Sequence, residues 1–244
     1  MKIFYVNKNA AFKKCGKLAL LVLAFCVFIE LCSSKNPVIS AFRAWAPLSG
    51  RVIVLDPGHG GIDGGTNTEG ILEKDINLEV ALVLRKLLEK NGVNVIMTRT
   101  TDIALDGLNN DSSSRHKRDL LARANIINKA SPDNFISIHV NADRRSSKVR
   151  GPMVFYYRKS EESKKLAEVL QKSIEDAYRN FGQKIPSRRP LANSSLFLLC
   201  NTRVPGVIIE MGFLSSPDDK NLLVSKEFQR AIAEAIVQGL KEYF

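Results

Sequence analysis

Apolar and polar residues alternate along the chain in blocks that have two different periods. Short apolar runs, typical of buried strands, alternate with longer stretches in which apolar residues recur every three or four positions, as in amphipathic helices. The predicted strands are 51–55, 93–98, 135–140, 153–157 and 207–210. The predicted helices are 73–91, 115–129, 166–181 and 228–243. This alternation predicts one α/β domain over 51–244, a three-layer sandwich with a largely parallel central sheet flanked by helices.

The first 50 residues follow a different pattern. Five lysines and no acidic residue lie in 1–17, and the uncharged run Leu18–Ile29 follows. A basic segment before a short apolar run is typical of a secretory signal. The run has twelve residues, which is short for a membrane span of about 20. We therefore expect 1–32 to be a signal peptide or an N-terminal membrane anchor, and 33–50 to be a linker. A buried helix is disfavoured, because the flanking lysines suit lipid headgroups better than a core.

The net charge of +11 is unevenly distributed along the chain. Seven basic residues and one acidic residue lie in 1–44, which leaves 29 and 24 in 45–244. A nucleic-acid-binding protein would concentrate its charge in a recognisable module, and the sequence has none, so we expect no nucleic-acid partner. Three of the four cysteines lie in the leader, the N-terminal segment 1–32. Cys200 remains, and we expect it to be a small buried apolar residue.

Side chains with metal-binding or acid–base chemistry follow three of the predicted strands. His59 lies in a glycine-rich loop after the first strand, His139 near the end of the third, and Glu210 at the end of the last. Sites in such sheets form at the carboxyl ends of the strands, so we expect the three side chains at one edge. A catalytic zinc needs about three nitrogen or oxygen ligands and an open position. Glu73, at the start of the first helix, is a candidate third ligand, but other acidic residues lie nearby.

Two simpler interpretations stay open at this point. A glycine-rich loop after a strand can cradle a phosphate, although this loop lacks the spaced glycines of nucleotide-binding loops. His139 can be a hydrogen-bonded core histidine. The remaining histidine, His116, lies in the basic run 115–118 and is expected on a solvated helix face. The polar segment 101–114 is expected to be a surface loop near the site.

Five motifs, taken together and in this order, resemble those of the zinc-dependent N-acetylmuramoyl-L-alanine amidases of bacterial cell walls. They are LDPGHGG at 55–61, LEKD at 72–75, MTR at 97–99, SIHVNA at 137–142 and IEMGFLS at 209–215. The resemblance spans 51–244. It implies that His59, Glu73 and His139 bind one Zn²⁺ and that Glu210 is the catalytic acid/base. It also implies that Asn141 and Arg123 lie near the site as substrate-binding residues.

The implied reaction is hydrolysis of the amide between N-acetylmuramic acid and the L-alanine of the peptidoglycan stem peptide. The short leader, the single domain and the Pro47–Gly50 lead-in are similar to those of sporulation- and germination-associated amidases of endospore formers. That similarity implies a role in making cortex muramic-δ-lactam, and an extracytoplasmic, exported or membrane-anchored location in the forespore or spore envelope. Ser216 departs from the asparagine that relatives often have there. The implied partners are a glycan strand with its stem peptide, a membrane through the N-terminal segment, and an accessory activating protein.

Two alternatives of other kinds remain. The first is a non-catalytic protein that binds or scaffolds peptidoglycan on the same fold. The second is another zinc hydrolase, such as a peptidase. The basic stretch 144–150 is expected to be a solvated rim that could meet anionic wall polymers.

Overall fold

The structure, a computed structural model, describes residues 46–244. The predicted signal peptide or membrane anchor (1–32) and the linker up to residue 45 lie outside the described residues. Within the part that the structure describes, no helix is both long and apolar enough to cross a membrane. The last part of the predicted linker packs into the folded domain, since Leu48 is 1% exposed and belongs to the main hydrophobic core.

The central sheet has six strands, β1 (Val52–Pro57), β4 (Asn94–Met97), β5 (Asn134–Asn141), β6 (Met153–Tyr157), β7 (Leu191–Asn193) and β8 (Gly206–Phe213). Their order across the sheet is β4-β1-β5-β8-β6-β7. The first four run parallel to one another, whereas β6 runs antiparallel to β8. β7 in turn runs parallel to β6. The predicted α/β class with a largely parallel sheet is confirmed.

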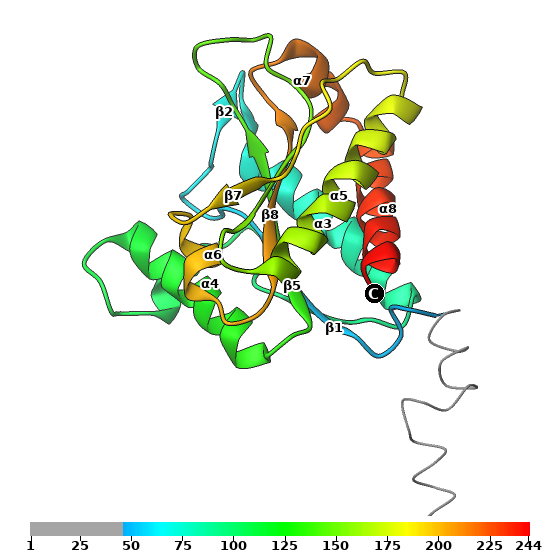
Figure 1. Ribbon diagram of the computed structural model, residues 1–244. Coiled ribbons are helices and arrows are strands. Elements are labelled where there is room, and N and C mark those ends of the chain that lie inside the picture. Colours follow the sequence, from blue (N-terminus) through cyan, green and yellow to red (C-terminus); the bar gives the residue numbers. More distant parts are fainter. Residues whose placement is uncertain (1–45) are drawn as a thin grey trace, which may run out of the picture. The chain divides into compact units, whose positions relative to one another are not determined.

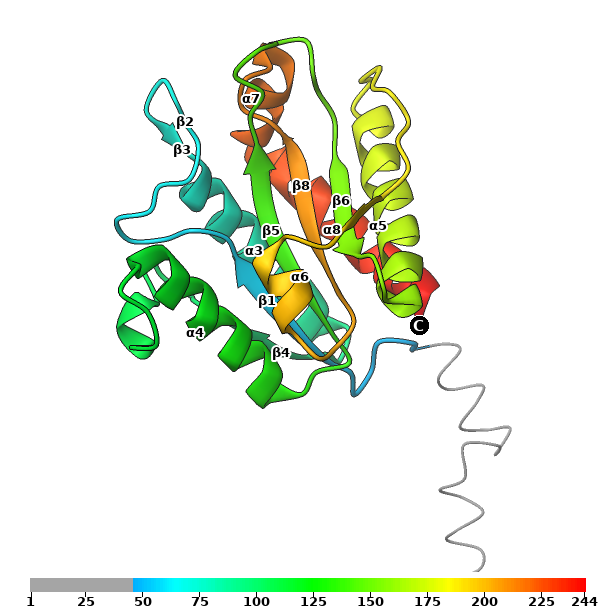
Figure 2. The same ribbon diagram turned by 60° about the vertical axis from the view of Figure 1, so that its left-hand side comes forward.

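Helices cover both faces of the sheet, as Figure 2 shows. One face carries α3 (Glu73–Lys90), α5 (Glu161–Asn180) and α8 (Lys226–Tyr243), which pack against one another. The other face carries α4 (Arg115–Ala130) and the short α6 (Phe197–Asn201). A further short helix, α7 (Pro217–Leu223), follows β8 (Figure 1). The layers are therefore helix, sheet and helix, as the sequence predicts.

The strands read as continuous apolar runs because both of their faces are buried. In β1, Ile53 and Leu55 belong to the large core under α3, α5 and α8, while Val54 faces the smaller core under α4 and α6. In β8, Ile208 faces the smaller core and its neighbours face the larger one. The carboxyl ends of β1, β5 and β8 consequently lie side by side at one edge of a rigid sheet.

The structure adds elements that the sequence pattern does not predict. They are short: the hairpin of β2 (Asn67–Thr68) and β3 (Ile71–Leu72), the strand β7, the helices α6 and α7, and the 3₁₀ turn η1 (Asp106–Leu108). Elements of two to seven residues are too short to show a clear period, so they escape pattern analysis. Helix α5 also begins five residues before the prediction, because Ser160 caps it by accepting a hydrogen bond from the N–H of Ser163.

Candidate metal centre

His59 is held in an unusual backbone conformation after β1. Its φ of 62° lies in the left-handed region, which non-glycine residues seldom adopt. Arg123 donates a hydrogen bond to the carbonyl of His59 at 2.6 Å and so fixes the loop. Nδ1 of His59 lies 2.9 Å from a carboxylate oxygen of Asp63. The ring is thereby oriented so that Nε2 faces Oε1 of Glu73 at 3.2 Å.

Glu73 is the first residue of α3, directly after the β2–β3 hairpin, and it is 3% exposed. One carboxylate oxygen accepts from the N–H of Thr66 at 2.9 Å, and the other accepts from the N–H of Val140 at 3.1 Å. None of its acidic neighbours is held in this way. Asp75, for example, is exposed on the outer side of the helix, and Glu69 pairs with Lys220 at the hairpin tip.

His139 lies on β5 with its ring packed against the backbone of Gly58. A Cβ atom at position 58 would overlap the ring, so only glycine allows this approach. Nδ1 of His139 lies 3.0 Å from the same Glu73 oxygen that faces His59. Its side chain is 21% exposed, which differs from the enclosed environment of a core histidine.

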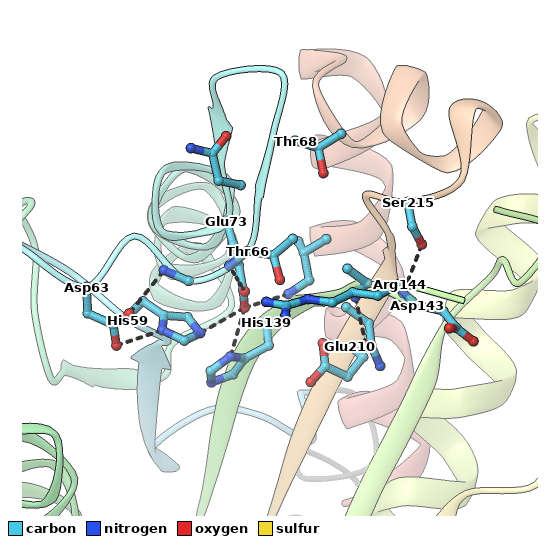
Figure 3. Close-up of a pocket in the computed structure, with 15 residues that line it drawn as sticks. His59, Asp63, Thr66, Thr68, Glu73, His139, Asp143, Arg144, Glu210 and Ser215 are labelled. Carbon is cyan, nitrogen blue, oxygen red and sulfur yellow. Dashed lines mark hydrogen bonds and ion pairs between the residues drawn. The ribbon is translucent and has the colours of Figure 1, made fainter. Parts of the chain in front are cut away.

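The two histidines and Glu73 form one cluster, in which the three donor atoms all lie within 4.8 Å of one another (Figure 3). Two imidazoles and a carboxylate suit zinc. Burial lowers the pKa of His59, but hydrogen bonds and negative charge from Glu73 and Asp63 outweigh burial and raise the pKa to about 9. Burial raises the pKa of Glu73, but His139 and His59 more than compensate and hold it far below its usual range. The cluster therefore attracts positive charge, which a metal cation can supply in place of a proton.

Glu210 lies on β8 beside His139, its partner in the strand register. Its Oε2 is buried and has no hydrogen-bond partner among residues 46–244. Burial, together with the charge of Glu73, raises the pKa of Glu210 to about 7, against the opposing effect of the two histidines. A carboxyl group with this pKa gains and loses a proton readily near neutral pH, as a general acid or base must.

The cluster and Glu210 line one cleft of about 780 Å³. Asn141, predicted to bind substrate, lies in its wall. Arg123, also predicted to bind substrate, does not line the cleft. Its side chain is 2% exposed and pairs with Asp56 at 2.7 Å and Asp119 at 2.6 Å beneath the His59 loop. The structure therefore assigns Arg123 contacts that support the loop.

Two residues that support the cluster have no role in the sequence analysis, although Arg99 lies in its MTR motif. Asp63 orients His59, and its position four residues after that histidine is a usable signal. Arg99 is buried and donates to the carbonyls of Pro57 and Gly58 at 3.0 and 2.9 Å. No local pattern indicates this contact, which joins residues more than forty positions apart.

The remaining predicted side chains lie apart from the cleft. His116 is exposed on α4, as predicted. Cys200 forms no disulfide within residues 46–244 and is only partly buried in α6, which differs from the buried position predicted for it.

Comparisons with known proteins agree with this geometry. The family described as N-acetylmuramoyl-L-alanine amidase matches residues 53–242. A germination-specific N-acetylmuramoyl-L-alanine amidase of Bacillus subtilis is 37% identical over 225 residues, which cover 91% of this chain and 92% of the relative. A probable cell wall amidase, LytH, of Staphylococcus aureus is 33% identical over 99% of this chain and 77% of its own length. The solved structure of the CwlD amidase from Clostridioides difficile, in complex with the GerS lipoprotein, is 34% identical with a TM-score of 0.72 over 80% of this chain and 98% of that one.

Proposed function

This chain belongs to the N-acetylmuramoyl-L-alanine amidase family, and from this premise we propose a zinc-dependent enzyme that releases stem peptides from peptidoglycan. The bond cleaved is the amide between the lactyl group of N-acetylmuramic acid and L-alanine. The observation that carries the proposal is the cluster of two histidines and Glu73, with the buried Glu210 beside it in one cleft.

His59, Glu73 and His139 are the proposed ligands of one Zn²⁺. Their donor types fit this ion, and their mutual contacts already hold the three side chains in one place. When bound, zinc supplies Lewis acidity, which polarises the amide carbonyl and makes water more acidic. Asp63 keeps the ring of His59 turned towards the site, and Arg123 keeps its backbone there.

Glu210 moves the proton in the proposed reaction. Its ionised carboxylate accepts a proton from the attacking water and then donates it to the nitrogen of the departing alanine. A pKa of about 7 permits both steps at neutral pH. Asn141 is the proposed substrate contact, since it lines the same cleft as the cluster and Glu210.

We also propose a role in modifying spore cortex for germination, in an extracytoplasmic location. The support is the Bacillus subtilis relative, which is named as a germination-specific amidase and is similar over nearly the full length of both chains. An accessory lipoprotein is a proposed partner, by analogy with the Clostridioides difficile complex. A non-catalytic peptidoglycan-binding protein is the second candidate, and a degenerate site would favour it, but each of the four proposed site residues is present.

The test is to incubate the zinc-loaded protein with purified peptidoglycan and to identify the products by mass spectrometry. We expect new N-terminal L-alanine and peptide-free muramic acid. Glu210→Ala should bind zinc at the same stoichiometry and release no peptide. His139→Ala should lose both zinc and activity.

Other results of the same assay would each indicate a different function. A cut between two amino acids would indicate a peptidase, and binding without any new amine would indicate a scaffold protein. Peptide release by Glu210→Ala would refute the proposed role of this residue.

A further inference from the structure

Arg144 is a cation in the cleft without a partner. It is the only lysine or arginine among the described residues that line this cleft. Three of the four carboxylates in the cleft are already engaged: Asp63 and Glu73 contact the two histidines, and Asp143 accepts from the N–H of Arg145. The fourth, Glu210, makes no ion pair with Arg144. No hydrogen bond or ion pair joins the Arg144 guanidinium to another residue within 46–244.

The backbone that carries Arg144 is fixed, although its side chain is exposed. The N–H of Asp143 donates to the hydroxyl of Ser215 at 2.9 Å, and the N–H of Leu214 donates to the carbonyl of Asn141 at 2.8 Å. These bonds tie the segment after β5 to the segment after β8. Arg144 therefore starts from a defined position at the cleft, which lowers the entropy cost of binding a ligand there.

Arg144 lies on the side of the cleft where Glu210 lies. Figure 3 shows Asp63 and His59 on one side of His139, and Glu210, Arg144 and Ser215 on the other. In the proposed function Glu210 protonates the departing alanine nitrogen, so the peptide half of the substrate has to lie on this second side. Arg144 is consequently placed towards the leaving peptide.

We propose that Arg144 is a specificity residue that binds a carboxylate of the leaving peptide, on the second residue of the stem. This inference rests on the proposed function. Arginine suits the task because its planar guanidinium donates two parallel hydrogen bonds to the two oxygens of a carboxylate, whereas a neutral amide has only one acceptor oxygen. Binding the carboxylate would hold the peptide in register while the amide reacts at the metal centre.

The test uses glycan strands whose stem peptides carry the second-residue carboxylate either free or converted to the primary amide. With the zinc-loaded protein, Arg144→Gln should lower kcat/KM for the free carboxylate roughly tenfold to hundredfold, the range for losing hydrogen bonds to a charged group. For the amidated form the loss should be less than about threefold. Arg144→Lys should keep part of the preference, because it keeps the charge without the paired donors.

Arg145→Gln is the matched control, since Arg145 is the next residue, is almost fully exposed and does not line the cleft. It should leave both rates nearly unchanged. An equal loss for both substrates with Arg144→Gln, or no loss for either, would overturn the inference.

A binding measurement keeps this test independent of turnover. By calorimetry, the wild-type protein should bind L-alanyl-D-glutamate more tightly than L-alanyl-D-isoglutamine, each with its γ-carboxyl blocked as an amide as in the stem, and Arg144→Gln should remove that difference. If the wild-type protein cleaves neither glycan form, the proposed function fails, and calorimetry alone decides the role of Arg144. Equal affinity of the wild-type protein for the two dipeptides would then reject it.

Discussion

Glu210, the proposed catalytic acid/base, occupies a position that is unfavourable for stability. Its carboxyl group is buried, and one oxygen has no hydrogen-bond partner among the described residues. A charged group in that position is costly, and burial raises its pKa to about 7. Between pH 4.5 and 7 the folded protein therefore keeps a proton that the unfolded chain has released, so stability falls as pH rises through this range.

We predict that Glu210→Gln stabilises the metal-free protein, and more so at pH 8 than at pH 5. At pH 8 the full penalty of ionising Glu210 is removed, which corresponds to about 3 kcal/mol or roughly 5–10 °C in Tm. At pH 5 most of the folded protein already carries the proton, so the gain should be small. Thermal unfolding in the presence of a chelator measures both values.

The matched control is Glu168→Gln on the exposed surface of α5, which should change Tm little at either pH. The explanation fails if Glu210→Gln gives the same change in Tm at pH 5 and pH 8.

At the scale of elements, α4 supports the loop that carries His59 from beneath. Arg123, near the middle of this helix, reaches Asp56 on β1, and the same guanidinium donates to the carbonyls of Pro57 and His59. Asp56 is itself fully buried and accepts from the hydroxyls of Thr98 and Ser137. Asp56 and Arg123 thus join α4 to β1, to β5, to the residue after β4 and to the loop.

Arg123→Gln should therefore affect folding and metal binding together. Leaving Asp56 as an uncompensated buried charge should cost about 3–5 kcal/mol. Loss of the bond to the His59 carbonyl should weaken zinc binding by roughly tenfold to hundredfold in molecules that remain folded. Urea unfolding and competition with a chromogenic chelator measure the two effects.

Arg118→Gln, on the same helix, is the control because Arg118 is partly exposed and pairs with Asp106 away from the metal centre. We expect a stability change below about 1 kcal/mol and unchanged zinc affinity. Unaltered zinc affinity in Arg123→Gln would contradict the supporting role of Arg123.

At the scale of the whole molecule, the proposed metal centre exists only in the folded state. Its three residues come from the loop after β1, the start of α3 and the end of β5, and lie 14, 66 and 80 positions apart in sequence. A cation that binds them binds the native protein and not the unfolded chain, so binding stabilises the fold.

Removal of metal should accordingly lower Tm, and Zn²⁺ should restore it. At a free zinc concentration about one hundred times Kd the gain is about 2.7 kcal/mol, or roughly 5–10 °C for a domain of this size. Differential scanning calorimetry with and without chelator measures it. The same addition of zinc to His139→Ala should leave Tm unchanged, and an equal rise in that variant would argue against the proposed ligand set.

Sequence and structure agree best for the long elements. The helices 73–91 and 115–129 are predicted to within one residue of α3 and α4. In a long helix the regular spacing of apolar residues shows clearly which face is buried. The direction of β6 is less accessible to pattern analysis. It runs antiparallel to β8 because the loop between β5 and β6 contains no helix, and a parallel pair would need a crossover connection.

By itself, the sequence determined the order of strands and helices, the two histidines that follow strands, and the motifs that carry the family resemblance. Each of these depends on residues close together in the chain, so a local pattern contains it. Only the tertiary structure decided that Glu73 is buried among donors while Asp75 faces solvent, and that Arg123 lies beneath the site. It also decided that Arg144 lies at the cleft on the side of Glu210. Such facts depend on contacts between distant residues, as between Asp56 and Arg123, 67 positions apart, and the packing of the whole domain sets them.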